Sequence, residues 1–181
     1  MCRFLIFFNI FLLISIGGFS QQIKGNFHVT GKVKVDQGVV DGIQIDIYRN
    51  GVRIQDLIVN RTGSFVVSID LGQVYQFRFI SDAYYPKTVE IDTHVPPEAC
   101  KIDCNFPPYQ LSLLLYKKVP GVKELEQQIG KVSYNPQIDN FDAEVLRQET
   151  NLKAMIEEAL IEVKQKSTLY NQQYVRDRKQ K

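Results

Sequence analysis

The stretch Ile43-Gln-Ile-Asp-Ile-Tyr-Arg-Asn-Gly-Val52 decides the fold of this chain. Its isoleucines, Ile43, Ile45 and Ile47, alternate with polar residues, which is the period of a strand with one buried face. Asn50-Gly51 is the most favourable two-residue hairpin turn, because both positions tolerate a positive φ. The sequence therefore predicts two antiparallel strands that are joined by a tight turn.

The same two-residue period continues on both sides of this hairpin. The predicted strands, separated by turn residues, lie at residues 27–35, 43–48, 52–59, 64–69, 75–80, 88–92 and 111–116. Short strands at regular spacing are typical of a β-sandwich or a small barrel. We therefore expect a mainly β domain over residues 21–118, followed by a connector at 119–139 that contains one short extended piece at 131–136.

A long C-terminal helix is predicted to follow the connector. Asp139 and Asn140 can each cap a helix, and residues 141–176 contain neither Gly nor Pro. Acidic residues near the start and basic residues at the end match the helix dipole. We expect an amphipathic helix with a basic tail over residues 140–181, roughly 50 Å long at about 1.5 Å per residue.

Apolar residues follow one side of this predicted helix. Their spacing is nearer eleven residues than seven, which disfavours an ordinary left-handed coiled coil. The stripe can pack on the sandwich or bind a partner, and the apolar residues Leu146, Ile161 and Leu169, which lie off the stripe, favour a partner. The residues expected to carry the docking are Phe141, Val145, Leu152, Ile156, Leu160 and Val163.

The first twenty residues match a secretory signal peptide. Arg3 precedes an uncharged apolar run over residues 4–16, and small residues then lead to a cleavage site before Gln21. The alternative is an uncleaved anchor, which needs about 20 apolar residues, whereas Asn9 interrupts this run. We expect an exported protein, periplasmic, outer-membrane-associated or extracellular, with no membrane span after cleavage.

Export makes Cys100 and Cys104 candidates for a disulfide, because the destination is oxidising. On a strand the two residues would lie about 13 Å apart, beyond the disulfide limit of about 7 Å, whereas a turn would bring them within reach. A local disulfide is the first interpretation. The alternatives are two thiols that are free or differently partnered, and a metal site for which only His94 lies nearby.

Composition and motifs narrow the function. The chain is 44% apolar and 23% charged, near the average of globular proteins. The chain has 22 Lys and Arg and 20 Asp and Glu, so it lacks the basic excess that is typical of a nucleic-acid-binding protein. The sequence has no Gly-x-Ser-x-Gly, His-Glu-x-x-His or phosphate-binding glycine loop. We expect no catalytic, cofactor-binding or metal-binding residues, and His28 and His94 are expected on the surface.

Four segments together resemble a known domain. These are Gly31-Lys-Val-Lys-Val35, Val40-Asp-Gly-Ile-Gln-Ile-Asp-Ile-Tyr48, Asn60-Arg-Thr-Gly-Ser-Phe65 and Ala83-Tyr-Tyr85. Their order is similar to the carboxypeptidase regulatory-like (transthyretin-like) β-sandwich, although Asn60 replaces the usual Asp and Ala83 the usual Gly. The resemblance implies a seven-stranded transthyretin/immunoglobulin-like β-sandwich without catalytic function, as in small exported envelope proteins of the Bacteroidota.

We therefore predict an exported, non-catalytic envelope protein that docks through its C-terminal helix. The predicted partner is an envelope protein or a second copy in a homo-oligomer. The alternative is a carbohydrate- or cell-surface-binding module that uses loop aromatics, and a hydrolase with convergent carboxylates comes third. The aromatic residues that could stack on a sugar are Tyr84, Tyr85, Phe106 and Tyr109, although core packing explains them as well.

Overall fold

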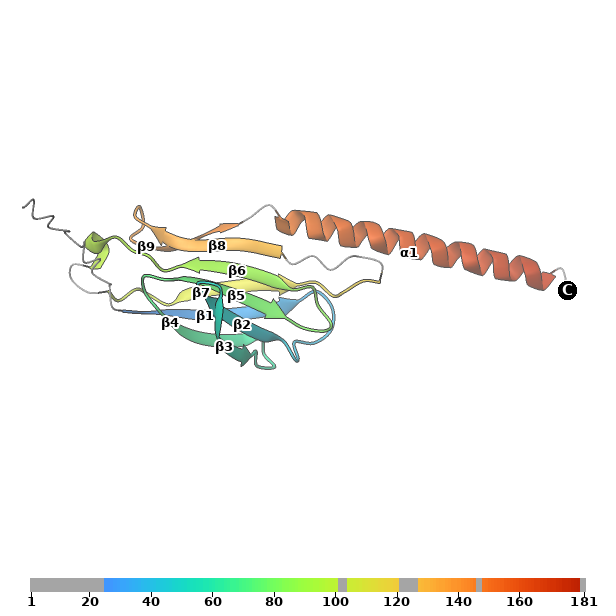
Figure 1. Ribbon diagram of the computed structural model, residues 1–181. Helices are drawn as coiled ribbons and strands as arrows, with labels where there is room; N and C mark the ends of the chain where they lie inside the picture. The colour runs from blue at the N-terminus through green and yellow to red at the C-terminus, as the bar shows by residue number, and fades with distance from the viewer. Residues whose placement is uncertain (1–24, 101–103, 121–126, 146–147, 180–181) are drawn as a thin grey trace, which may run out of the picture.

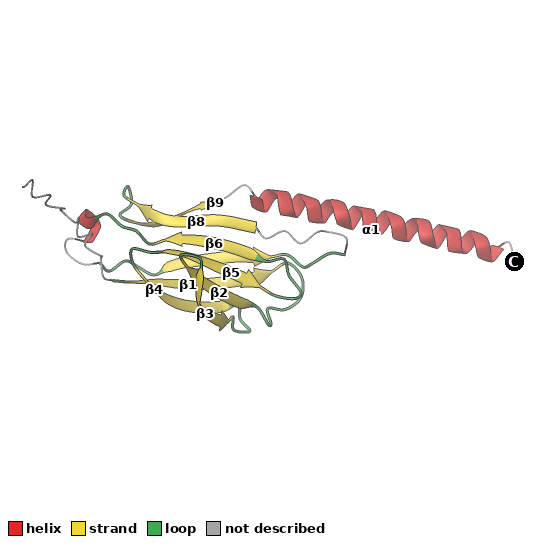
Figure 2. Cartoon of the chain, in the orientation of Figure 1, coloured by secondary structure: helices red, strands yellow, loops and turns green. Residues whose placement is uncertain are grey.

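The computed structural model describes residues 25–100, 104–120, 127–145 and 148–179 (Figure 1). Within these residues the fold is mainly β, with two sheets and one long C-terminal helix (Figure 2). The predicted signal peptide at 1–20 lies outside the described residues. The strands are β1 (Asn26–Val35), β2 (Gln44–Arg49), β3 (Val52–Ile58), β4 (Ser64–Asp70), β5 (Val74–Ile80), β6 (Lys87–Asp92), β7 (Tyr109–Leu115), β8 (Gln127–Asn135) and β9 (Asn140–Val145). The helices are the short 3-10 helix η1 (Pro97–Cys100) and α1 (Gln148–Lys179).

The strands form a three-stranded sheet of order β4-β1-β7 and a six-stranded sheet of order β3-β2-β5-β6-β8-β9. Most neighbours are antiparallel, but β1 pairs with β7 and β6 with β8 in parallel. Parallel neighbours need a crossover rather than a tight turn. The chain makes these crossovers by leaving the six-stranded sheet after β6, pairing β7 with β1, and returning as β8.

The β2–β3 hairpin forms as its sequence predicts. Asn50 and Gly51 both have positive φ, at 49° and 80°, and Arg49 pairs with Val52 across the turn. All seven strands predicted from alternation are present, each within two residues of its expected bounds. Local alternation and turn chemistry are therefore sufficient to place these strands.

The core lies between the sheets and is built from alternate residues of their strands. The largest side chains that are completely enclosed include Phe27 of β1, Ile45 of β2 and Phe77 of β5. Gly31 of β1 leaves room for the ring of Phe65, which occupies the space that a side chain at Gly31 would need. Each large apolar side chain buried in this way stabilises the fold by about 1.5–3 kcal/mol.

The region after β7 corrects the prediction. Within the expected connector at 119–139, the extended piece expected at 131–136 is part of a longer strand, β8, over residues 127–135, and residues 140–145 form β9 rather than the first turns of the helix. The described chain therefore has nine strands instead of seven, and α1 begins at Gln148. Asp139 and Asn140, expected as helix caps, end the β8–β9 turn, where Asp139 has a φ of 50°. The side chain of Asn135 accepts a hydrogen bond from the Gln137 amide at 3.0 Å and stabilises the same turn.

Helix α1 extends away from one end of the sandwich, and most of its length has no strand beside it (Figure 1). Its 32 residues correspond to about 48 Å at ~1.5 Å per residue, close to the predicted length. In the part of the chain that is described, no helix combines the length and the apolar character needed to cross a membrane.

Candidate interaction surface

Helix α1 touches the sandwich near its start, at a small apolar contact that we call the joint. Ile156 is 6% exposed and packs against Tyr85, which is 1% exposed, with Tyr116 and Val119 partly buried beside them. Tyr85 lies between β5 and β6, whereas Tyr116 and Val119 follow β7. The joint therefore unites α1 with two loops that are far apart in the sequence.

Hydrogen bonds hold the two loops of the joint together. The amide of Tyr85 donates to the carbonyl of Tyr116 at 2.9 Å. The hydroxyl of Tyr85 donates to the carbonyl of Val119 at 3.3 Å and accepts from the amide of Val119 at 3.1 Å. Lys87, which is completely buried in β6, places its Nζ 4.8 Å from the centre of the Tyr116 ring, a cation–π distance. The sandwich thus offers Ile156 a fixed surface.

Past the joint, the apolar side of α1 continues without a cover. Leu160 is 46% exposed, Val163 49% and Tyr170 73%, and we call these three residues the seam. They follow Ile156 at intervals of four, three and seven residues, so all four lie on one side of the helix. The same side of α1 is therefore buried on the sandwich at the joint and exposed beyond it.

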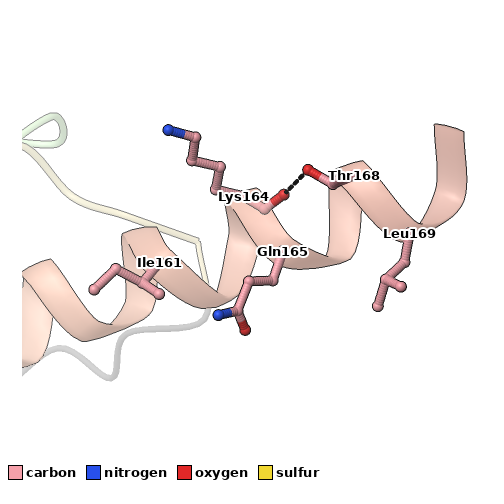
Figure 3. A pocket seen from close by; sticks show the side chains of 5 residues that line it. All are labelled: Ile161, Lys164, Gln165, Thr168 and Leu169. Atoms are coloured by element: carbon pink, nitrogen blue, oxygen red, sulfur yellow. Dashed lines mark hydrogen bonds between the residues drawn. The ribbon is translucent and has the colours of Figure 1, made fainter. Parts of the chain in front are cut away.

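A second group of exposed apolar residues lies on the other side of α1. Ile161 and Leu169 lie five and thirteen residues after Ile156, which places them away from the seam, and Figure 3 shows them with Lys164, Gln165 and Thr168, which line the same open surface. The Thr168 hydroxyl donates to the carbonyl of Lys164 at 2.9 Å, a local bond common in helices. One helix alone supplies all five residues, so this is an open surface and differs from the enclosed pockets that bind small molecules.

The six residues predicted to dock are divided among different environments. Phe141 lies in the core on β9, with its ring centre 4.0 Å from that of Phe27, so it is not a helical docking residue. Ile156 forms the joint, and Leu160 and Val163 are exposed on α1. The side chains of Val145 and Leu152 lie outside the described part of the structure.

This division also corrects the predicted spacing of the stripe. Phe141 and Val145 belong to a strand and leave the helical stripe, and on α1 the seam residues follow Ile156 at intervals of four, three and seven. Alternation of four and three is the heptad spacing of a left-handed coiled coil. The stripe on α1 therefore begins after these two residues, and the positions from Ile156 to Tyr170 fit the heptad.

The structure joins Cys100 and Cys104 in a disulfide, with their Cα atoms 4.6 Å apart. Cys100 is the last residue of η1, and the short distance to Cys104 excludes the extended strand in which the two would lie too far apart. Both cysteines pack against the edge of the main core. Among the described residues, no group of three or more His, Cys, Asp and Glu side chains is arranged to hold a metal ion.

The outer face of the six-stranded sheet carries ion pairs. Arg53 lies 2.6 Å from the buried carboxylate of Asp46 and 3.6 Å from Asp56. Lys131 of β8 lies 3.2 Å from Glu90 and 3.6 Å from Asp92, both on β6. These acids already have cationic partners, so the arrangement is typical of a structural surface.

Asp92 also binds His94, whose ring is exposed and lies 2.7 Å away. Partial burial acts to raise the pKa of Asp92, but hydrogen bonds from His94 and the charges of His94 and Lys131 bring that pKa below its ordinary value. The hydrogen bond and charge of Glu90 raise the pKa of Lys131. His28, as expected, lies exposed on β1.

The aromatic residues considered for sugar binding face inward. Tyr84, Tyr85 and Phe106 are buried, and Tyr109 is half-buried. The Tyr84 hydroxyl is 2.9 Å from the Gln37 carbonyl and 3.1 Å from the Val39 carbonyl, so it is held inside the protein. These rings therefore pack in the core and joint and do not form an exposed stacking platform.

Comparison with known proteins leaves the family of this chain open. No family model matches the sequence, and no curated protein matches it. Among solved structures, the chain is similar to one titled "Crystal Structure of S.CueP", with 11% sequence identity and a TM-score of 0.34. The match covers 51% of this chain and 64% of the other, so the chain spans less than two thirds of that protein. A likeness of this size supports no conclusion about family or function.

Proposed function

We propose that this chain is an exported, non-catalytic envelope protein whose β-sandwich presents α1 as a docking element. The seam carries the proposal, because Leu160, Val163 and Tyr170 are 46%, 49% and 73% exposed in a row along the same side of the helix that is buried at Ile156. Apolar residues that cluster on a surface mark interaction sites. The signal-like residues 1–20 and the transthyretin-like pattern of residues 31–85 support export and the family of the sandwich.

The joint gives this docking element its geometry. Ile156 fixes the start of α1 against Tyr85, and the rest of the helix extends past the end of the sandwich. A partner that covers the seam would remove its side chains from water, and that burial drives association. The sandwich is then the folding unit that positions the helix, and the helix supplies the contact.

The test compares two double variants of the mature protein. Leu160→Asp with Val163→Asp places charge on the seam, whereas Ile161→Asp with Leu169→Asp places the same charge on the other side of α1. Both variants leave the joint and the core untouched. Intact cells are crosslinked mildly, and each variant is then captured through an affinity tag.

We expect the seam variant to lose its crosslinked products and the control variant to keep them. Urea denaturation of each purified variant checks that the sandwich is as stable as in the wild type. Equal crosslinking of the wild type and the seam variant would refute docking through the seam. Equal loss in both variants would show that the seam has no special role in α1.

A further inference from the structure

We infer that the seam binds a second copy of this chain, with the two α1 helices antiparallel; this inference rests on the proposed function and names its partner. The first observation is the distribution of charge along the helix. Residues 148–163 carry four glutamates and one lysine, whereas residues 164–179 carry three lysines, two arginines and one aspartate. The two halves of α1 therefore have opposite net charge.

This distribution selects one orientation. Packed helices lie about 8–10 Å apart, within the Debye length of about 10 Å at 0.1 M salt, so their charges interact. A parallel pair would place the two basic halves together and the two acidic halves together. An antiparallel pair that overlaps beyond the joint places Glu157, Glu158 and Glu162 of each helix at the level of the basic C-terminal end of the other, which makes a second copy the natural complement.

Ion pairs within α1 do not remove the preference for an antiparallel arrangement. Lys153 lies 3.9 Å from Glu157, and Lys166 lies 3.9 Å from Glu162, with all four side chains largely exposed. Exposed pairs of this kind contribute little and are easily rearranged. Both halves of α1 keep their overall sign of charge after these pairs are counted.

The spacing of the seam is the second observation. Leu160, Val163 and Tyr170 follow Ile156 at intervals of four, three and seven, and the polar Ser167 occupies the core position between the last two, so these residues fit the two core positions of a heptad. This is the pattern by which helices pair along a narrow line. The seam therefore suits a helix of similar shape, and α1 itself is such a helix.

The joint is the third observation, because it limits where the second helix can lie. Ile156 is already covered by the sandwich, so a partner helix covers α1 only beyond it. The remaining residues 158–179 form about three heptads and extend roughly 33 Å at ~1.5 Å per residue. In an antiparallel pair the two sandwiches lie at opposite ends of this overlap and do not obstruct one another, whereas a parallel pair brings both to the same end.

The first measurement is the mass of the purified mature protein by sedimentation equilibrium. We expect a dimer for the wild type and for the Ile161→Asp with Leu169→Asp control. The dissociation constant of the Leu160→Asp with Val163→Asp variant should rise by about a hundredfold or more, because two buried apolar side chains become charged. A monomeric wild type, or a seam variant that still forms the dimer, would overturn the inference.

The second measurement determines the orientation. Glu157→Cys and Arg178→Cys variants are mixed in equal amounts under mild oxidation, because both positions flank the seam. An antiparallel pair joins Glu157→Cys to Arg178→Cys and yields mainly the mixed disulfide dimer. Crosslinking of each variant only to itself indicates a parallel pair and overturns the inference.

The two assays separate this inference from the proposed function. If the pure wild type is monomeric but the seam variant still loses crosslinked products in cells, the second copy is the wrong partner and docking through the seam stands. If the seam variant equals the wild type in both assays, the inference and the proposed function both fail.

Discussion

The β8–β9 hairpin and helix α1 are consecutive in the chain, but the hairpin buries most of its large apolar side chains whereas the helix exposes most of its own. In the hairpin, Ile129, Val132 and Phe141 are buried, whereas Leu160 and Leu169 of the helix are largely exposed. The hairpin adds to the open edge of β6 and covers the end of the core, but α1 meets the sandwich at the joint and then leaves it. An apolar residue in this part of the chain is therefore buried only where its strand or helix packs against the sandwich.

Among variants of the hairpin and the helix, Phe141→Ala is expected to lower the stability of the protein most. Phe141 lies in a cluster of rings, with its centre 4.0 Å from that of Phe27 and 5.2 Å from that of Phe106. Removing such a ring from a core lowers the free energy of unfolding by about 3–5 kcal/mol. Urea denaturation of the mature protein measures this change.

Leu160→Ala is the matched control for Phe141→Ala, because both residues were expected on one helical stripe. At low protein concentration, where α1 is unpaired, its effect should stay within about 0.5 kcal/mol, as for other surface positions. Similar losses for the two variants would contradict the assignment of Phe141 to the core and Leu160 to the surface.

The sequence predicts the first seven strands because their signals are local. Ile43, Ile45 and Ile47 alternate, and Asn50-Gly51 can form the tight turn without help from the rest of the chain. The parallel pairing of β6 with β8 has no such local signal, because the two strands are separated by η1 and β7. Sheet order therefore depends on contacts that alternation does not reveal.

The β8–β9 hairpin was missed because its residues fit two structures. Phe141 and Val145 are four residues apart and continue a helical stripe, but they also alternate with Asp142 and Glu144 as in a strand. Asp139, a good helix cap, is equally suited to the positive φ of a turn. The alternation and the preceding Asn-Pro turn were the signals that could have identified the hairpin.

The candidate surface was predicted in part. Helical spacing alone places Leu160 and Val163 on one side of α1. The contact between Ile156 and Tyr85 joins residues 71 positions apart, so no local pattern indicates it. The sequence therefore identifies the apolar side of the helix but not the point where the sandwich stops covering it.

The next largest effect is expected at the boundary between the two regions. Ile156→Ala removes the side chain that holds α1 on Tyr85, and a buried aliphatic truncation of this kind costs about 2 kcal/mol or more. Because the joint is separate from the main core, the loss should free the start of the helix and leave the sandwich intact. Hydrogen exchange should increase around residues 153–160 and remain unchanged in β5. Increased exchange throughout β5 would show that the joint is part of the core.

A smaller effect on stability is expected from loss of the disulfide, which lies on the sandwich and not on the helix. Cys104 is two residues from Phe106, whose ring packs edge-on against Phe141. A bond between residues four apart closes a short loop, so Cys100→Ser with Cys104→Ser should cost about 2 kcal/mol or less. Thermal denaturation checks this, and a loss larger than that of Phe141→Ala would contradict the ranking. Association through α1 should not change.

The smallest effect on stability is expected from the ion pairs, which join two strands where the hairpin meets the sheet but lie within a single element in the helix. Lys131 of β8 binds Glu90 and Asp92 of β6 and thereby helps to hold the hairpin on the sheet. The Asp92 pKa in the folded protein lies below its ordinary value of 3.8. Its contribution to stability is therefore complete above this ordinary pKa and is lost as the pH falls through the folded pKa. The pKa of Lys131 is raised above 10.5, so its contribution is present below that value and is lost at higher pH.

The free energy of unfolding, measured as the pH is lowered, distinguishes the ion pairs of the hairpin from those of the helix. Asp92→Asn should lower the free energy of unfolding at neutral pH and flatten its dependence on pH in the acid range, because the titrating carboxylate is gone. Glu157→Gln is the matched control for loss of an ion pair, since its pair with Lys153 spans 3.9 Å on an exposed helix surface and should contribute little to stability. Equal slopes for Asp92→Asn and the wild type would mean that the interactions of Asp92 with His94 and Lys131 do not contribute to stability. The hairpin would then rely on the pair of Lys131 with Glu90, on the pairing of β6 with β8 and on its apolar contacts, above all those of Phe141 with Phe27 and Phe106.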